Sequence, residues 1–316
     1  MFIGVDHGTV AVRFGTDDGQ TFELSRETAK KMADKRLLES ILNGLNVEKS
    51  NIDLIAISYS MGDAITKITD IQRATNRGVR CAKGAGTFIG GGTHVFDMLK
   101  KSDIPAIVLP GIHSRSDVDL RMKMFSHGAS PEKVGAAYHV LLQGYDVFIL
   151  SDISSNTVTL GVADGKIIGA IDACIFAPGI LQGPLDLEAI RDVNSGKMSA
   201  SDAFSSGGVL KHATYKSIVD LLSMKDGVSR LAIDRLALFG AMEIAAMKVL
   251  VEDHSELKHI FVCGKDIIRQ KISLLLNKEI LGLDRWCAAI GCAEIARDVY
   301  AGKDNILGIN VDYTRK

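Results

Sequence analysis

Residues 2–9 read FIGVDHGT, and this stretch decides the fold class. An apolar strand ends at Asp6 and runs directly into small residues, so several backbone N–H groups are exposed in one concave turn. Extended patterns at 10–15 and 21–24 follow, and an Asp-Gly turn at 17–19 joins them into a three-strand meander. Such a turn binds phosphate oxygens, and its carboxylate holds Mg²⁺ directly or through water.

The same layout returns in the second half of the chain, where an apolar strand leads to Asp152. Asp6 and Asp152 are 146 positions apart, and further residues match at this offset: Thr9 with Ser155, Val12 with Val158, Gly15 with Gly161, Asp18 with Asp164 and Gly19 with Gly165. Two unrelated meanders are the alternative, because Asp-Gly turns are common. The shared offset favours a duplication. It predicts a first domain over 1–145 and a second over 146–316, with the last helix, from about 286, packing back at the domain interface.

The composition excludes several classes of protein. Of the 316 residues 47% are hydrophobic, which is enough for sizeable cores, and the net charge of −1 speaks against phosphate-driven nucleic-acid binding. The apolar stretch 231–251 carries charges at four positions, so it predicts an amphipathic helix and not a membrane span. The five cysteines are scattered without a CxxC pair, and the start of the chain lacks the pattern of a signal peptide. We therefore expect a cytoplasmic protein with neither nucleic acid nor membrane as a partner.

Taken with the strand 260–263 that breaks at Gly264 and the small residues of 288–293, the two turns resemble the acetate and sugar kinase/Hsp70/actin superfamily. The resemblance implies an α/β fold of two duplicated ribonuclease-H-like domains, of the actin/Hsp70/sugar-kinase type, with a central nucleotide cleft. It also implies ATP and Mg²⁺ as cofactors, with Asp6 and Asp152 near the metal. The nucleotide- and phosphate-binding residues that follow from it are Gly4, Asp6, His7, Gly8, Thr9, Arg13, Asp152, Ser154, Ser155, Asn156, Thr157 and Gly264.

The chain departs from the superfamily pattern at a few of these positions. Ser154 and Ser155 stand where glycine is usual, and Arg13 stands where several relatives carry a lysine that reaches the phosphates. The segment SHGASPEK at 126–133, combined with the other motifs, resembles the methanogenesis marker protein 12 family of methanogenic archaea. That resemblance implies a protein partner in methanogenesis and leaves the reaction open.

Candidate catalytic residues lie outside the two turns. A phosphoryl transfer needs a base near the acceptor, usually a carboxylate. Asp63 lies just beyond a predicted buried strand, and Asp117 follows the segment 110–116. Their alternative roles are structural, because Asp63 could cap the next turn and Asp117 the predicted helix over 118–125. His113 and Asp117 are four residues apart, so a helix would place them on one face as metal ligands.

Three functions follow as hypotheses. The first is an ATP-dependent phosphotransferase or ATPase, with Asp6 and Asp152 around Mg²⁺. The second is a non-catalytic nucleotide sensor or assembly factor for a methanogenesis enzyme. The third is a metal-dependent group transferase that uses His113. Whether the chain forms a homo-oligomer is left open by its sequence.

Overall fold

The computed structural model describes residues 1–81, 90–212 and 226–315. The chain divides into two compact units, of which the first joins Met1–Asp146 to Trp286–Lys316 and the second is Val147–Arg285. The boundary near residue 146 lies where the duplicated motif begins again. The expected second domain ran to residue 316, whereas the stretch from Trp286 onward belongs to the first unit.

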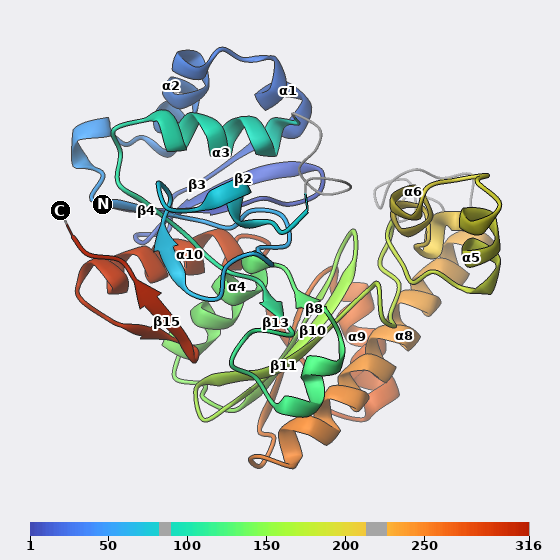
Figure 1. The fold of residues 1–316 in the computed structure, drawn as a ribbon. Helices are drawn as coiled ribbons and strands as arrows, with labels where there is room; N and C mark the ends of the chain where they lie inside the picture. The colour runs from blue at the N-terminus through green and yellow to red at the C-terminus, as the bar shows by residue number, and fades with distance from the viewer. Residues whose placement is uncertain (82–89, 213–225, 316) are drawn as a thin grey trace. The chain divides into compact units, whose positions relative to one another are not determined.

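The first unit is built on an eight-stranded mixed sheet (Figure 1). Its strands are β1 (Phe2–Asp6), β2 (Ala11–Thr16), β3 (Thr21–Ser25), β4 (Leu54–Ile57), β5 (Ile68–Asp70), β6 (Ala106–Val108), β14 (Asn305–Ile306) and β15 (Ile309–Asp312), in the order β14-β15-β5-β6-β4-β1-β2-β3. β1, β2 and β3 form the antiparallel meander that the sequence predicts, and β4 and β6 extend it in parallel with β1. A two-stranded ribbon of β7 (Ile112–His113) and β8 (His127–Ala129) completes the unit's strands in the described residues.

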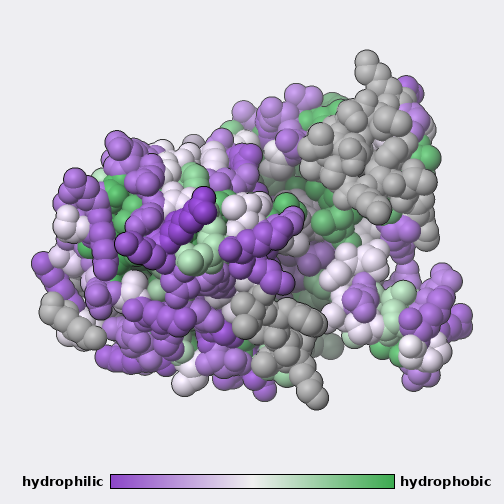
Figure 2. Space-filling view, turned by 90° about the horizontal axis from the view of Figure 1, so that it is seen from above, coloured by the Kyte–Doolittle hydropathy of each residue, from purple (hydrophilic) through white to green (hydrophobic). Residues whose placement is uncertain are grey.

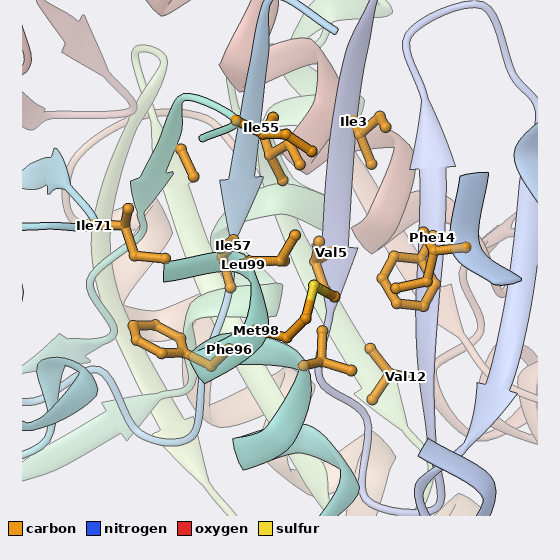
Figure 3. Packing of buried hydrophobic residues seen from close by; sticks show 14 of the residues in the cluster. Ile3, Val5, Val12, Phe14, Ile55, Ile57, Ile71, Phe96, Met98 and Leu99 are labelled. Atoms are coloured by element: carbon orange, nitrogen blue, oxygen red, sulfur yellow. The ribbon is translucent and has the colours of Figure 1, made fainter. Parts of the chain in front are cut away.

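Helices cover both faces of this sheet. On one face lie α1 (Arg26–Lys31), α2 (Asp34–Leu45) and α3 (Gly91–Lys101), and on the other lie α4 (Pro131–Leu142) and α10 (Cys287–Tyr300) (Figure 1). The alternation of side chains along β1 sends Ile3 and Val5 into an apolar core under α3, where they meet Phe14, Ile57 and Phe96 (Figure 3). Gly4 and Asp6 therefore face α4 and α10.

The second unit is a five-stranded mixed sheet with the same plan. Its strands are β9 (Phe148–Ile153), β10 (Thr157–Ala163), β11 (Lys166–Asp172), β12 (His259–Cys263) and β13 (Leu281–Leu283), in the order β11-β10-β9-β12-β13. The long helix α8 (Gly227–Glu252) packs on β9, β10 and β11, and α9 (Asp266–Leu276) packs beside it. The remaining helices of the described residues are α5 (Leu187–Asn194) and α6 (Ala200–Ser205), and short 3-10 turns occur at η1 (Lys49–Asn51), η2 (Thr75–Gly78), η3 (Leu120–Met124) and η4 (Val209–His212).

The two units share one topology. In each, the first four strands along the chain lie in the order 3-2-1-4 across the sheet, and the fourth strand is parallel both to the first strand and to its other neighbour, which is β6 in the first unit and β13 in the second. The α/β fold class predicted from the sequence is confirmed. The registers differ by one residue, because Asp6 pairs with Arg13 whereas Asp152 pairs with Val158. The second turn is thus one residue shorter than the first.

Close contact between β1 and α10 depends on glycine at position 4, and this gives the first prediction. A Cβ at Gly4 would lie 2.0 Å from the Ala289 carbonyl oxygen and 2.4 Å from the Ala293 nitrogen. Gly4→Ala must push α10 away from the sheet, so we expect a loss of about 2 kcal/mol in the free energy of unfolding, measured by urea titration. Gly227→Ala is the matched control, because nothing lies within 4 Å of its Cβ position. An equally stable Gly4→Ala variant would contradict this packing.

Candidate functional site

The candidate site in the first unit is centred on Asp6, at the carboxyl end of β1. The residue is only 3% exposed, and its Oδ2 accepts a hydrogen bond from Nη1 of Arg13 at 3.1 Å. Its Oδ1 is buried and has no hydrogen-bond partner among the described residues. Burial and the charge of Glu132 together raise the pKa of Asp6 to about 6, against the opposing charges of Arg13 and Lys133. A carboxylate that is this poorly satisfied is prepared to bind a cation or a donor.

Arg13 is held in place by the sheet register. β2 pairs Arg13 with Asp6 on one side and with Glu23 of β3 on the other, so the three side chains lie in one row across the meander. Nε of Arg13 donates to Oε2 of Glu23 at 2.9 Å. Nη1 of the guanidinium group therefore donates to Asp6, while Nε is held by Glu23. An arginine fixed in this way can present N–H donors to a phosphate oxygen beside Asp6.

The first turn of α4 brings two further charges to Asp6. Glu132 and Lys133 follow the first-turn proline, and Nζ of Lys133 lies 3.1 Å from Oε1 of Glu132. Lys133 is buried, and both charges shift the pKa of Asp6. These two residues are missing from the sequence-based site, in which the segment 126–133 carried only the family resemblance. The available signal was a pair of opposite charges in the first turn of a helix that is otherwise largely apolar.

His7 occupies the hinge between β1 and the turn. Its backbone N–H donates to Oγ of Ser58 at 3.2 Å, and its ring Nε2 lies 3.0 Å from the carbonyl oxygen of Gly92. Because a carbonyl only accepts, Nε2 carries the proton and Nδ1 does not. Burial and the charge of Arg26 lower the pKa of His7 to about 3, so the ring is neutral. In this arrangement the ring has no N–H left for a phosphate.

The remaining predicted residues of the first turn lie nearer the surface. Thr9 is exposed and Gly8 is partly exposed. A Cβ at Gly8 would lie 3.0 Å from the carbonyl oxygen of Ala11 and 3.1 Å from Nη1 of Arg13. Glycine is therefore needed to let the turn backbone pass beside the guanidinium group.

The second unit forms its own turn at Asp152, Ser154, Ser155, Asn156 and Thr157. The turn is braced by the loop that follows β11. The carbonyl oxygens of Ser154 and Ser155 accept hydrogen bonds from backbone N–H groups at 180–182, and Oγ1 of Thr157 donates to the carbonyl oxygen of Pro178 at 3.0 Å. Pairing of Cys263 with Asp152 brings Gly264 to this turn, where its Cβ position lies 3.0 Å from the carbonyl oxygen of Ile153.

Glu243 of α8 supports the bracing loop from below. This side chain is fully buried, and its Oε2 accepts the backbone N–H of Ala177 at 3.0 Å. Burial raises the pKa of Glu243 to about 8, and the charge of Asp172 acts in the same direction. A buried acid beneath a loop that shapes the turn was not predicted, because the sequence shows Glu243 only as one charge within an amphipathic helix.

Asp63 and His113 make hydrogen bonds of their own. His113 sits in β7, and its two ring nitrogens contact the carbonyl oxygen of Ile65 at 2.9 Å and the backbone N–H of Arg115 at 3.2 Å. The helix that would place His113 and Asp117 on one face is not formed, because Ile112 and His113 pair with β8 instead. Oδ1 of Asp63 accepts the backbone N–H of Arg80 at 3.1 Å. Over 1–81, 90–212 and 226–315, no group of three or more His, Cys, Asp or Glu side chains could hold a metal ion.

In the part of the chain that the structure covers, no helix combines the length and apolar character needed to cross a membrane.

The Asp6 site fits Mg²⁺ by its donor set. This ion commonly binds through one or two carboxylates, phosphates and water, and Asp6 has an unsatisfied oxygen with Glu132 nearby.

The fold is that of the acetate kinase and ROK sugar kinase class. A propionate kinase from Francisella tularensis matches with a TM-score of 0.59 at 13% identity, over 93% of this chain and 91% of that one. An acetate kinase from Entamoeba histolytica matches at 0.58 and 12%, over 87% and 86%. A ROK family glucokinase from Streptomyces griseus, solved with glucose and AMPPNP, matches at 0.50 and 15%, over 94% and 99%.

The sequence relatives identify the family. A UPF0285 protein of Methanosarcina mazei is 52% identical over 99% of both chains. Another from Methanocaldococcus jannaschii is 40% identical over 98% of this chain and 99% of its own. No model of a protein family matches the chain. The chain belongs to the UPF0285 family.

Proposed function

We propose that this protein binds Mg²⁺-ATP and that Asp6 is the centre of its phosphate and metal site. The observation that carries the proposal is Oδ1 of Asp6, a buried carboxylate oxygen without a hydrogen-bond partner in the described chain. Such an oxygen costs free energy unless a ligand satisfies it. Mg²⁺ with a bound polyphosphate would do so, since the cation favours the ionised carboxylate.

The residues around Asp6 supply the rest of a polyphosphate site. Asp6 would hold the metal directly or through water, with Glu132 on the same side. Arg13 and Lys133 would balance the negative charge of the phosphates. Asp152, Ser154 to Thr157 and Gly264 are proposed as a second phosphate-binding turn, in line with the duplicated topology. The AMPPNP bound by the ROK glucokinase of the same fold supports a nucleotide as the ligand.

The biological setting is proposed from the relatives. Those matched here come from methanogens of the genera Methanosarcina, Methanococcus and Methanocaldococcus, which supports the methanogenesis marker protein 12 assignment and a role tied to methanogenesis. A nucleotide sensor or assembly factor is the second candidate. It is favoured by the hydrogen bonds that tie Asp63 and His113 to the backbone, because neither side chain is then placed as a base at Asp6.

Calorimetric titration of the full-length protein with Mg²⁺-ATP tests the binding. We expect binding that requires both Mg²⁺ and the phosphates, so ADP should bind, and adenosine should bind at least tenfold more weakly, a difference of about 1.4 kcal/mol. Phosphate release measured on the same sample separates an ATPase from a sensor. Absence of binding at millimolar nucleotide, or equal affinity for adenosine and ATP, would rule the proposal out.

A further inference from the structure

Arg26, the first residue of α1, carries a charge that no carboxylate of the described chain pairs with. The residue is half-buried, and its Nε atom is buried without a hydrogen-bond partner. The guanidinium group instead contacts the backbone, where Nη2 donates to the carbonyl oxygen of His7 at 3.2 Å. Burial lowers the pKa of Arg26, and the nearby acidic groups of Tyr59, Glu132 and Asp6 offset only part of this effect. Burying a cation in this way costs free energy unless a ligand accepts its hydrogen bonds.

Two other arginines of the first unit are satisfied by the protein itself. Arg13 pairs with two carboxylates, and Arg77 donates from Nε and Nη2 to the two oxygens of Asp97 at 2.7 and 2.8 Å. Hydrophilic side chains make up much of the face shown in Figure 2, and water satisfies charges that are exposed in this way. Arg26 has neither a carboxylate nor full exposure to water. Its remaining donors are therefore left for a ligand.

Three glycines open α3 beside this guanidinium group. A Cβ at Gly92 would lie 3.4 Å from both Cζ and Nη2 of Arg26, and a Cβ at Gly91 would lie 2.0 Å from the Arg26 carbonyl oxygen. Gly90 is the N-cap and has no side chain that could accept from the first N–H groups of the helix. The helix therefore begins against a cation, without an acidic or hydroxyl cap. An arginine beside such a helix start suits an anionic ligand with several oxygens.

This group lies on the opposite side of the strand end from the Asp6 site. Val5 points toward α3, whereas Asp6 faces α4 and α10 (Figure 3). His7 returns to the α3 side, where its ring Nε2 lies 3.0 Å from the carbonyl oxygen of Gly92. The residue is 6% exposed, and its Nδ1 is a second buried atom without a partner among the described residues. Arg26 and His7 therefore define a polar site distinct from the one proposed for Mg²⁺.

We propose that Arg26 binds the oxyanion of a second ligand, a phosphate or carboxylate group, beside the first turn of α3. The site goes beyond the binding of Mg²⁺-ATP at Asp6 and does not require it. Because Nη2 of Arg26 also holds the carbonyl oxygen of His7, this ligand would lie against the backbone of the first turn. That position suits the acceptor of a phosphotransferase or the effector of a sensor.

Calorimetric titration of the full-length protein with inorganic phosphate tests the site. The titration contains EDTA and no nucleotide, so its result does not depend on Mg²⁺-ATP. We expect saturable binding by the wild type and affinity about tenfold lower for Arg26→Lys, which keeps the charge and loses the Nε donor and the planar fork. Arg26→Met should lose the binding while its far-ultraviolet circular dichroism stays unchanged. Arg36→Gln is the matched control, because Arg36 is an exposed arginine of α2 and its loss removes the same charge.

Two further arms identify the anion and its source. Acetate at the same ionic strength replaces phosphate in the second arm, and binding of either anion that depends on Arg26 supports the proposal and names the class. The third arm repeats the titration in saturating Mg²⁺-ATP, where an anion that still binds is a second ligand. An anion displaced by ATP would show that Arg26 holds the phosphates of the nucleotide and would overturn the separate site. Absence of binding by both anions, or equal binding by wild type and Arg26→Lys, would also overturn it.

Discussion

Replacing Asp6 by asparagine is expected to weaken Mg²⁺-ATP binding by about a hundredfold, or about 3 kcal/mol, without lowering the melting temperature. Asparagine has the same shape and keeps an oxygen that accepts from Nη1 of Arg13, which lies 3.1 Å from Oδ2 in the wild type. It removes the negative charge that would attract the cation. The loss of affinity should therefore come without a change in packing, and titration calorimetry of the variant measures it.

The effect on stability has the opposite sign. Burial raises the pKa of Asp6 to about 6 from an ordinary value of 3.8, so the folded protein holds this proton more tightly than the unfolded chain. The stability from Asp6 is present below pH 3.8 and is lost as the pH rises through about 6. Asparagine avoids this loss. Thermal melts of both proteins without ligand at pH 5 and pH 7.5 should show the variant gaining relative to the wild type at the higher pH.

Ligand binding by the wild type should depend on the same proton. Mg²⁺ needs the ionised carboxylate, so the affinity for Mg²⁺-ATP should fall by up to tenfold for each unit of pH below about 6. Asp17→Asn is the control, because Asp17 accepts from the backbone N–H of Phe2 at the far end of the same strand. A variant at Asp6 that binds as tightly as the wild type, or a control that loses as much affinity, would remove Asp6 from the site.

The parts of the fold that could be predicted depend on short-range patterns. The apolar alternation before Asp6 and the two Asp-Gly turns fix the meander, and the shared offset of 146 correctly indicated a repeated strand order. Local signals are weaker after the meander, where the apolar spacing of 28–42 predicts a single helix. The chain breaks it at Met32 and Ala33 into α1 and α2, although neither residue is a helix breaker. Packing of α1 against α3 explains the break, and that contact is not visible locally.

The residues missed at the site are those that come from distant elements. Glu132 and Lys133 are 126 or more positions from Asp6 and reach it only because α4 packs on α10, which itself packs on β1. Glu243 reaches Ala177 in the same way, through the packing of α8 on its sheet. For His113 the prediction itself was wrong. Its four-residue spacing to Asp117 suggests a helix, whereas His113 pairs with β8 and so lies in a strand. Spacing along the chain predicts which side chains lie together only where the secondary structure of that segment is predicted correctly.

Glu243→Gln is expected to stabilise the protein at alkaline pH, by about 3 kcal/mol at pH 9. Burial raises the pKa of Glu243 to about 8 from an ordinary value of 4.5. The carboxyl group is then neutral in the folded state, and its contribution to stability, present below pH 4.5, is lost as the pH rises through about 8. Glutamine is always neutral, and its side-chain oxygen can accept from the backbone N–H of Ala177 as Oε2 does.

Urea titrations from pH 5 to pH 9 measure this difference, which should be small at pH 5 and grow steadily. Glu256→Gln is the control, because Glu256 is exposed just beyond α8 and should follow the wild type. Glu243→Ala should destabilise the protein at every pH, since it leaves a cavity and the Ala177 N–H unpaired. Identical pH dependence in wild type and glutamine variant would show that Glu243 is already ionised.

Because the loop that Glu243 supports also holds the carbonyl oxygens of Ser154 and Ser155, the same ionisation should loosen the second turn. The glutamine variant should then keep its Mg²⁺-ATP affinity at pH 9 while the wild type loses it, which links a buried proton beneath the sheet to the proposed phosphate site.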